Sequence, residues 1–223
     1  MPPASARYYP EHHPSEAYLV DYASGAAPEP VAVLIATHLA FCPHCRDEMR
    51  LLEELGGTLL DALPPAAMPS GSLGRILARL DNPDEPEPGA PRPARGDPAL
   101  PEPLRGYVGG ALVDLPWRRL GPIAEVRLLP QHGAFTTRLL QIHAGAGVPA
   151  HTHEGSEITL VLRGSYSDAT GRYRPGDVAE ADGEIDHHPV ADPGEDCLCF
   201  AVTDAPLKLT GRFGRLLNPF VRL

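Results

Sequence analysis

The chain has 223 residues, of which 43% are hydrophobic and 22% are charged, so it can bury a packed core and is not disordered throughout. Its formal net charge of −10 fits poorly with direct binding to nucleic acid phosphates and suits a basic protein partner better. No apolar run approaches the ~20 residues needed to cross a membrane, and residues 1–10 lack the pattern of a signal peptide. We therefore expect a cytoplasmic protein that binds neither a membrane nor nucleic acid directly.

The first part of the chain is expected to be helical. One helix should lie between residues 14 and 25, where a proline suits the first turn and a glycine suits the C-terminal cap. A second should span about residues 29–41. Pro43 should end it and begin a third helix, which stops at the pair Gly56-Gly57.

A fourth helix is expected to begin near Ser70 or Ser72, because serine is a favourable N-cap residue. Its apolar residues recur at the spacing of a single helical stripe, which is formed by Leu73, Ile76, Leu77 and Leu80. A short helix with such a stripe must cover either its own domain or a partner.

Residues 82–103 are rich in proline and poor in apolar side chains, so they are expected to form an extended linker. The chain then divides into residues 1–81, the linker 82–103 and residues 104–223. The last part is expected to be a β-sandwich or β-barrel, because short apolar or alternating runs are separated by glycine and proline turns. The clearest expected strands are residues 134–143, 157–162, 177–181 and 197–202.

A cluster of possible metal ligands lies in the helical part. His38 and Cys42 are four residues apart, so they share a helix face, and Cys45 follows just beyond the proline. Structural zinc takes four such ligands, and the fourth can come from His13 or His12 upstream. The alternatives are a redox-active C-x2-C dithiol, a site that releases zinc on thiol oxidation, and unliganded cysteines.

A second cluster lies in the β part, in the pattern G-x5-H-x-H-x3-E-x6-G, which resembles the first cupin motif. His151 and His153 alternate on an expected strand and so share a face, and the motif spacing selects Glu157 over Glu154 as a third ligand. Three histidines and a carboxylate suit zinc, iron, manganese or nickel. The alternative is a set of surface histidines without a metal.

The fourth ligand of this second cluster comes from a degenerate second cupin motif. Its spacing selects His187 over His188, although the proline, glycine and asparagine of that motif are replaced by Asp182, Glu184 and Ala191.

Cys197 and Cys199 alternate on one expected strand. Such neighbours are about 6.5–7 Å apart, which is awkward for a mutual disulfide. They are either buried core cysteines or thiols near the metal that take part in sensing an oxidant.

Residues 12–56 resemble the zinc-binding domain of anti-sigma factors, in which an upstream histidine precedes H-x3-C-x2-C. Residues 13–25 also resemble the opening helix of the ChrR type, which carries a C-terminal cupin domain. The resemblance implies an α + β protein with a small helical zinc-binding anti-sigma domain and a cupin, a jelly-roll-like antiparallel β-barrel. It implies that the zinc ligands are His13, His38, Cys42 and Cys45, and it places a Cys-x-Cys in the cupin domain.

By this resemblance, the helical domain binds and inhibits an extracytoplasmic-function sigma factor. The metal-binding cupin domain senses an oxidative signal such as singlet oxygen and promotes release of the sigma factor. We therefore expect a transcription regulator rather than an enzyme. The rival hypotheses are a cupin dioxygenase or isomerase with a regulatory helical domain, and a thiol-redox sensor based on Cys42 and Cys45.

Overall fold

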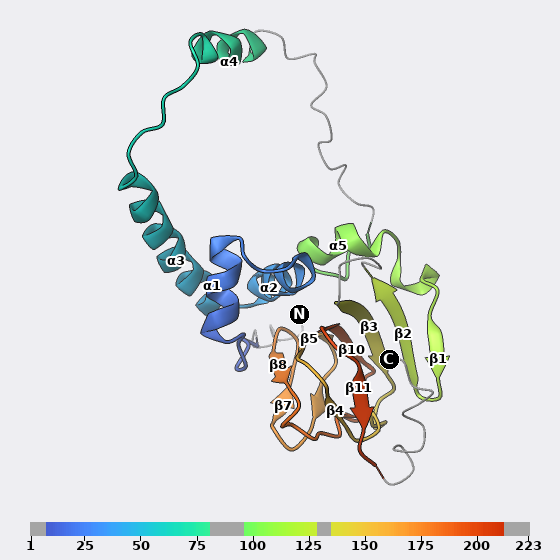
Figure 1. The fold of residues 1–223 in the computed structure, drawn as a ribbon. Helices are drawn as coiled ribbons and strands as arrows, with labels where there is room; N and C mark the ends of the chain where they lie inside the picture. Colours follow the sequence, from blue (N-terminus) through green and yellow to red (C-terminus); the bar gives the residue numbers. More distant parts are fainter. Residues whose placement is uncertain (1–7, 81–95, 129–134, 212–223) are drawn as a thin grey trace, which may run out of the picture.

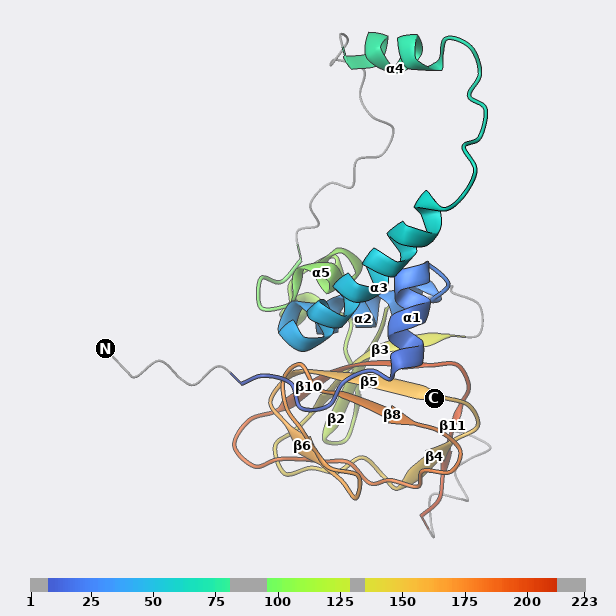
Figure 2. The same cartoon turned by 90° about the vertical axis from the view of Figure 1, so that its left-hand side faces the viewer.

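In a computed structural model, which describes residues 8–80, 96–128 and 135–211, a group of helices packs against one end of a β-domain (Figure 1). One helix stands apart from both (Figure 2). The helices are α1 (Glu16–Ser24), α2 (Glu29–Phe41), α3 (Pro43–Asp61), α4 (Ser72–Leu80) and α5 (Glu102–Val108), and a 3-10 turn follows at Leu112–Asp114.

The first two helices confirm the sequence predictions. Gly25 ends α1 in the left-handed conformation with φ of 75°, which glycine adopts without steric cost. Helix α2 carries buried side chains on several sides, Leu34 and Ile35 among them, because it lies between the other helices and the sheet.

Helix α3 does not end at Gly56-Gly57, so that prediction was wrong. Neither glycine has a positive φ, and the helix continues to Asp61. A glycine inside a helix costs about 1 kcal/mol relative to alanine. It therefore weakens a helix without ending it unless the backbone turns into the left-handed region.

Three antiparallel sheets form the β-domain within the described residues. The largest has the order β1-β2-β3-β10-β5-β8, and β4 and β11 form a second sheet, while β7, β6 and β9 form a third. The strands are β1 (Arg118–Leu120), β2 (Ile123–Leu128), β3 (Thr136–Ile142), β4 (His151–His153), β5 (Glu157–Arg163), β6 (Tyr166–Ser167), β7 (Arg172–Tyr173), β8 (Val178–Ala181), β9 (Val190–Ala191), β10 (Cys197–Thr203) and β11 (Leu207–Leu209). The arrangement confirms the antiparallel β-domain that the sequence predicted.

The range predicted as a linker is only partly described, and residues 81–95 lie outside the described residues. From residue 96 onward the chain packs: Leu100 and Leu104 are buried, and α5 begins at Glu102, inside the predicted range. Prolines at the first positions of a helix cost no hydrogen bond, so the high proline content of this segment is compatible with α5.

The helices and the sheet share one hydrophobic core. It contains Leu34 of α2, Leu104 of α5, and Leu139 and Phe200 of the large sheet. The helical part is therefore positioned by contacts with the β-domain as well as by its own packing.

Candidate metal centres

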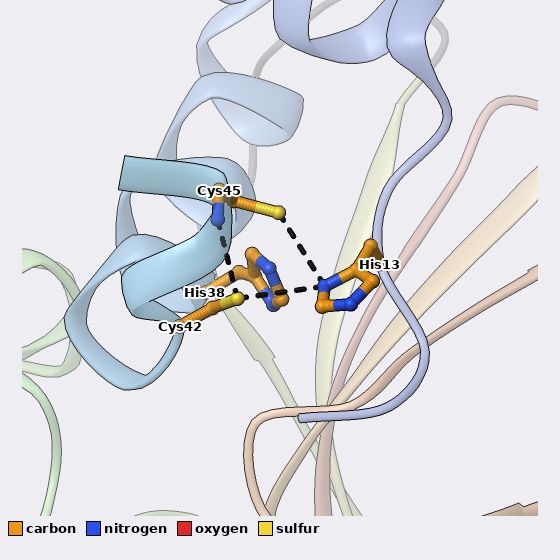
Figure 3. A group of neighbouring side chains, drawn as sticks. All are labelled: His13, His38, Cys42 and Cys45. Carbon is orange, nitrogen blue, oxygen red and sulfur yellow. Dashed lines mark hydrogen bonds between the residues drawn. The ribbon is translucent and has the colours of Figure 1, made fainter. Parts of the chain in front are cut away.

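The first candidate site brings together one residue before α1 and three at the junction of α2 and α3 (Figure 3). One ligand atom from each of His13, His38, Cys42 and Cys45 lies within 4.8 Å of the others. The Nδ1 atom of His13 is 3.4 Å from both thiol sulfurs. The chain turns between the two cysteines because Pro43 begins a new helix, and the amide of Cys45 donates to the Cys42 sulfur at 3.4 Å.

The imidazole of His38 is fully buried and its two nitrogens face different partners. Nδ1 lies 2.7 Å from the backbone carbonyl oxygen of Gly176, to which it can donate. Nε2 has no hydrogen-bond partner among the described residues, although it is buried. A buried nitrogen without a partner is costly, and a metal ion held by the four residues would remove that cost, since ligating histidines commonly donate their other nitrogen to a carbonyl.

The protonation state of His38 suits a metal, whereas the Cys45 thiol would need the charge of the metal to ionise. Burial lowers the pKa of His38 to about 4, so the ring is neutral at pH 7 and Nε2 can accept a metal. Burial, followed by the neighbouring Cys42, raises the pKa of Cys45 to about 12. A divalent ion would supply the positive charge that two buried thiolates need. The residues present therefore fit a structural metal ion.

The other histidines near this group point elsewhere. The His12 ring packs on Tyr173, with 4.5 Å between the ring centroids. His44 is exposed and its Nε2 lies 3.3 Å from a carboxylate oxygen of Glu48. Of the two upstream candidates, the structure thus brings His13 to the thiols.

His13 is held in place by the β-domain, which sequence reasoning missed. Asp177 is fully buried, and its carboxylate accepts hydrogen bonds from the amides of Glu11 and His12 at 2.7 and 3.1 Å and from the Tyr8 hydroxyl at 2.7 Å. No periodicity or motif signals such a contact, because Asp177 is more than 160 residues away from its partners.

The second candidate site lies inside the β-domain. The four residues chosen by the motif spacing, His151, His153, Glu157 and His187, each place a ligand atom within 4.8 Å of the others. The His187 Nε2 atom is 3.0 Å from Nε2 of His151 and 3.2 Å from Nε2 of His153. Paired backbone hydrogen bonds between His151 and His187 fix this register.

The surroundings orient these rings. Nδ1 of His151 lies 2.8 Å from the carbonyl oxygen of Pro149, and Nδ1 of His187 lies 3.1 Å from the carboxylate of the buried Asp168. Such partners leave each Nε2 free to bind a metal. Burial, followed by the neighbouring His187, lowers the pKa of His153 to about 4, which keeps its ring neutral. Asp168, like Asp177, had no signal in the sequence.

The pair Cys197 and Cys199 lies on β10 beside this site. Both thiols are buried, and their sulfurs are 3.5 Å apart, which is closer than the regular strand spacing predicts. The pairing of β10 with β5 is irregular at this point, because the register shifts between Leu198 and Cys199.

Comparisons with known proteins agree with this geometry. Residues 108–206 match the model of the ChrR cupin-like domain. The chain is 43% identical over 213 residues to the anti-sigma-E factor ChrR of Cereibacter sphaeroides, an alignment that covers 95% of this chain and 98% of the relative. The chain belongs to the ChrR family of anti-sigma factors. This membership supports a regulator rather than an enzyme.

A solved structure of the ChrR family shows the same fold over most of the chain. The crystal structure of Rhodobacter sphaeroides SigE in complex with the anti-sigma factor ChrR superposes with a TM-score of 0.77 at 41% sequence identity, covering 87% of this chain and 100% of that one. Among the residues described here, none of the helices combines the length and hydrophobicity that a membrane crossing requires.

Proposed function

We propose that this ChrR-family chain binds and inhibits an extracytoplasmic-function sigma factor through its helical part. The observation that carries the proposal is an apolar surface without a cover among the described residues. Helix α4 stands apart from the other elements (Figure 1) and exposes all four members of its stripe, and α3 exposes a second row of leucines. The exposed residues are Leu51, Leu55 and Leu59 on α3 and Leu73, Ile76, Leu77 and Leu80 on α4.

Exposed apolar rows of this kind mark an interface, because each leucine that a partner covers contributes about 1.5–3 kcal/mol. The related complex has a sigma factor, SigE, as the partner of ChrR. We propose that the partner of this chain is also a sigma factor. The net charge of −10 is compatible with a basic partner.

In this proposal the chain has three functional segments: residues 1–81 form the inhibitory domain, 82–103 the linker and 104–223 the sensory cupin domain. The end of the linker, from residue 96, packs on the shared core. Zinc bound by His13, His38, Cys42 and Cys45 holds α2, α3 and the segment before α1 in one arrangement. Two thiols and two imidazoles are a donor set that zinc favours in structural sites.

The cupin centre is proposed to sense an oxidative signal, with singlet oxygen as the candidate. His151, His153, Glu157 and His187 would hold zinc or another divalent transition metal, since imidazole and carboxylate ligands suit several such ions. Cys197 and Cys199 are the proposed oxidant-sensitive thiols, because only a small movement separates their sulfurs from bonding distance. The signal would bias the equilibrium between a sigma-bound and a released state.

The test of sigma binding uses two matched substitutions on α4. Leu77→Asp places a charge within the exposed stripe, whereas Ala78→Asp places the same charge on the opposite side of the helix. With SigE of the related complex as the probe, Leu77→Asp should weaken binding at least ~10-fold, because a buried charge and a lost apolar contact together exceed ~1.4 kcal/mol. Ala78→Asp should bind as the unmodified chain does. Equal binding by both variants, or no binding of SigE by the unmodified chain, would overturn the proposal.

A further inference from the structure

The β-domain contains a cavity of about 280 Å³ between the large sheet and the strands β4 and β11. Its walls are mainly apolar, with Leu140, Ile142 and Leu209 among them, and the second candidate metal site contributes His151, Glu157 and His187 to the lining. Leu120, on the edge strand β1, also lines the cavity and is itself exposed, so this side connects to solvent. The volume lies just below the roughly 300–1,000 Å³ of pockets for drug-sized ligands, so the cavity suits a smaller molecule.

One charged side chain in the wall lacks hydrogen bonds. Arg138 on β3 is only 5% exposed, and its guanidinium makes no hydrogen bond with any described residue; Nε is fully enclosed without a partner. Its nearest opposite charge is Glu125, whose Oε2 is 3.7 Å from Nε, too long for a hydrogen bond. A buried guanidinium with unused donors is costly unless an acceptor joins it.

Two carboxylates in the cavity wall, Glu125 and Glu157, lie near Arg138, but neither accepts a hydrogen bond from it. Glu125 is shared, because its other oxygen lies 3.2 Å from the guanidinium of Arg118. Glu157, a proposed ligand of the cupin metal centre, also lines the cavity and attracts Arg138. A divalent ion at that centre would take up the charge of Glu157, so the unused donors of Arg138 would remain available to an anion. Burial lowers the pKa of Arg138 from its usual value, and a bound anion would offset that effect.

The sheet leaves space beside Arg138. Across the sheet, Arg138 pairs with Ala201 of β10, and Ala201 pairs with Thr159 of β5. Because Ala201 is small, the guanidinium is not covered from that side, and both Arg138 and Thr159 line the cavity.

We propose that this cavity binds a small amphipathic monocarboxylate, whose carboxylate pairs with Arg138 and whose alkyl chain packs on the leucine and isoleucine walls. Arginine is suited to this role because its planar fork donates two parallel hydrogen bonds to a carboxylate. The inference goes beyond the proposed sigma binding and does not depend on it, since the cavity and the α4 surface lie in different parts of the molecule.

Calorimetric titration of the full chain, as purified with its metals, tests this with three probes. Hexanoate should bind with one-to-one stoichiometry. Hexanamide, which has the same chain but no charge, and acetate, which has the charge but no alkyl chain, should each bind at least ~10-fold more weakly. Equal binding of hexanoate and hexanamide, or no binding of hexanoate, would overturn the proposal.

Two charge-matched variants locate the site. Arg138→Gln should lower hexanoate affinity at least ~10-fold without changing hexanamide binding, whereas Arg119→Gln, on the exposed face of β1, should leave both unchanged. Unaltered hexanoate affinity in a folded Arg138→Gln variant would refute the assignment and place the carboxylate elsewhere. If that variant does not fold, nuclear Overhauser contacts between hexanoate and the methyl groups of Leu140 and Leu209 in the unmodified chain decide the question, and their absence refutes it.

Discussion

The Nδ1 atom of His38 lies 2.7 Å from the carbonyl oxygen of Gly176, so a proposed zinc ligand in the helical part is oriented by a turn of the β-domain. The same turn holds the segment that carries His13, through the carboxylate of Asp177. Two of the four residues of the first metal group are thus positioned by the β-domain. A conformational change in the β-domain would therefore move two of the four proposed metal ligands, His13 and His38.

Asp177→Ala should weaken metal binding in the helical part. The substitution leaves the amides of Glu11 and His12 without their acceptor, and each of these partly buried hydrogen bonds to a charged group contributes about 1.5–3 kcal/mol. We expect faster zinc transfer to a colorimetric chelator. Asp97→Ala is the control, because Asp97 also accepts two backbone hydrogen bonds but lies away from the metal group. Equal transfer rates in the two variants would show that Asp177 does not position His13.

Gly176→Ala should separate the helices from the β-domain. Gly176 has φ of 95°, and an added Cβ would lie 2.7 Å from atoms of Phe41 and Pro10. Gly194→Ala is the control, since Gly194 has φ of 114° and nothing within 4 Å of an added Cβ. Backbone strain of about 1–3 kcal/mol is common to both, so urea unfolding should show a larger loss of stability for Gly176→Ala. Equal losses of stability in the two variants would mean that the close approach of Gly176 to Phe41 and Pro10 does not contribute to stability.

Cys45→Ser should remove one equivalent of zinc and loosen the helical part. Structural zinc contributes about 10–16 kcal/mol in zinc-finger peptides, far more than the packing of these short helices can replace. Elemental analysis should show the loss, and trypsin should cleave faster after Arg50 in α3, which is exposed but helical. Cys197→Ser, a control in the β-domain, should keep this zinc. Full zinc content in Cys45→Ser would contradict the assignment of the ligands.

The thiol of Cys199 should react slowly with iodoacetamide in the native chain. The hydrogen bond with Cys197 and then burial raise its pKa well above the usual value, and only the thiolate is an effective nucleophile. Mass spectrometry should find Cys199 unmodified at pH 7.5 after a treatment that alkylates it completely in 6 M guanidinium. Rapid alkylation in the native state would contradict the burial and the raised pKa of this thiol.

Local patterns in the sequence predicted the elements and the candidate ligands. The strand predicted at residues 197–202 is β10, and the helix predicted at 29–41 is α2. The spacing H-x3-C-x2-C places three candidate ligands together because helix geometry and a proline turn act over few residues. The H-x-H pair on β4 is also a local pattern, because alternate residues of a strand share a face.

Contacts between distant segments were not predictable. Asp177 and Arg138 have roles that depend on which segments meet in space, and no periodicity encodes them. Leu100 was assigned to a linker because its proline-rich neighbours dominate the composition, although its side chain enters the shared core. The end of α3 was misjudged because glycine permits a left-handed turn without requiring one.

The most direct test of the account measures the metal content of the chain and its binding to SigE, and compares three forms. The unmodified chain should carry two equivalents of metal and bind SigE. A variant with His151→Ala and His153→Ala should carry one equivalent and still bind, whereas one with Cys42→Ser and Cys45→Ser should carry one equivalent and fail to bind. SigE binding by the cysteine variant, or fewer than two equivalents in the unmodified complex, would contradict the account.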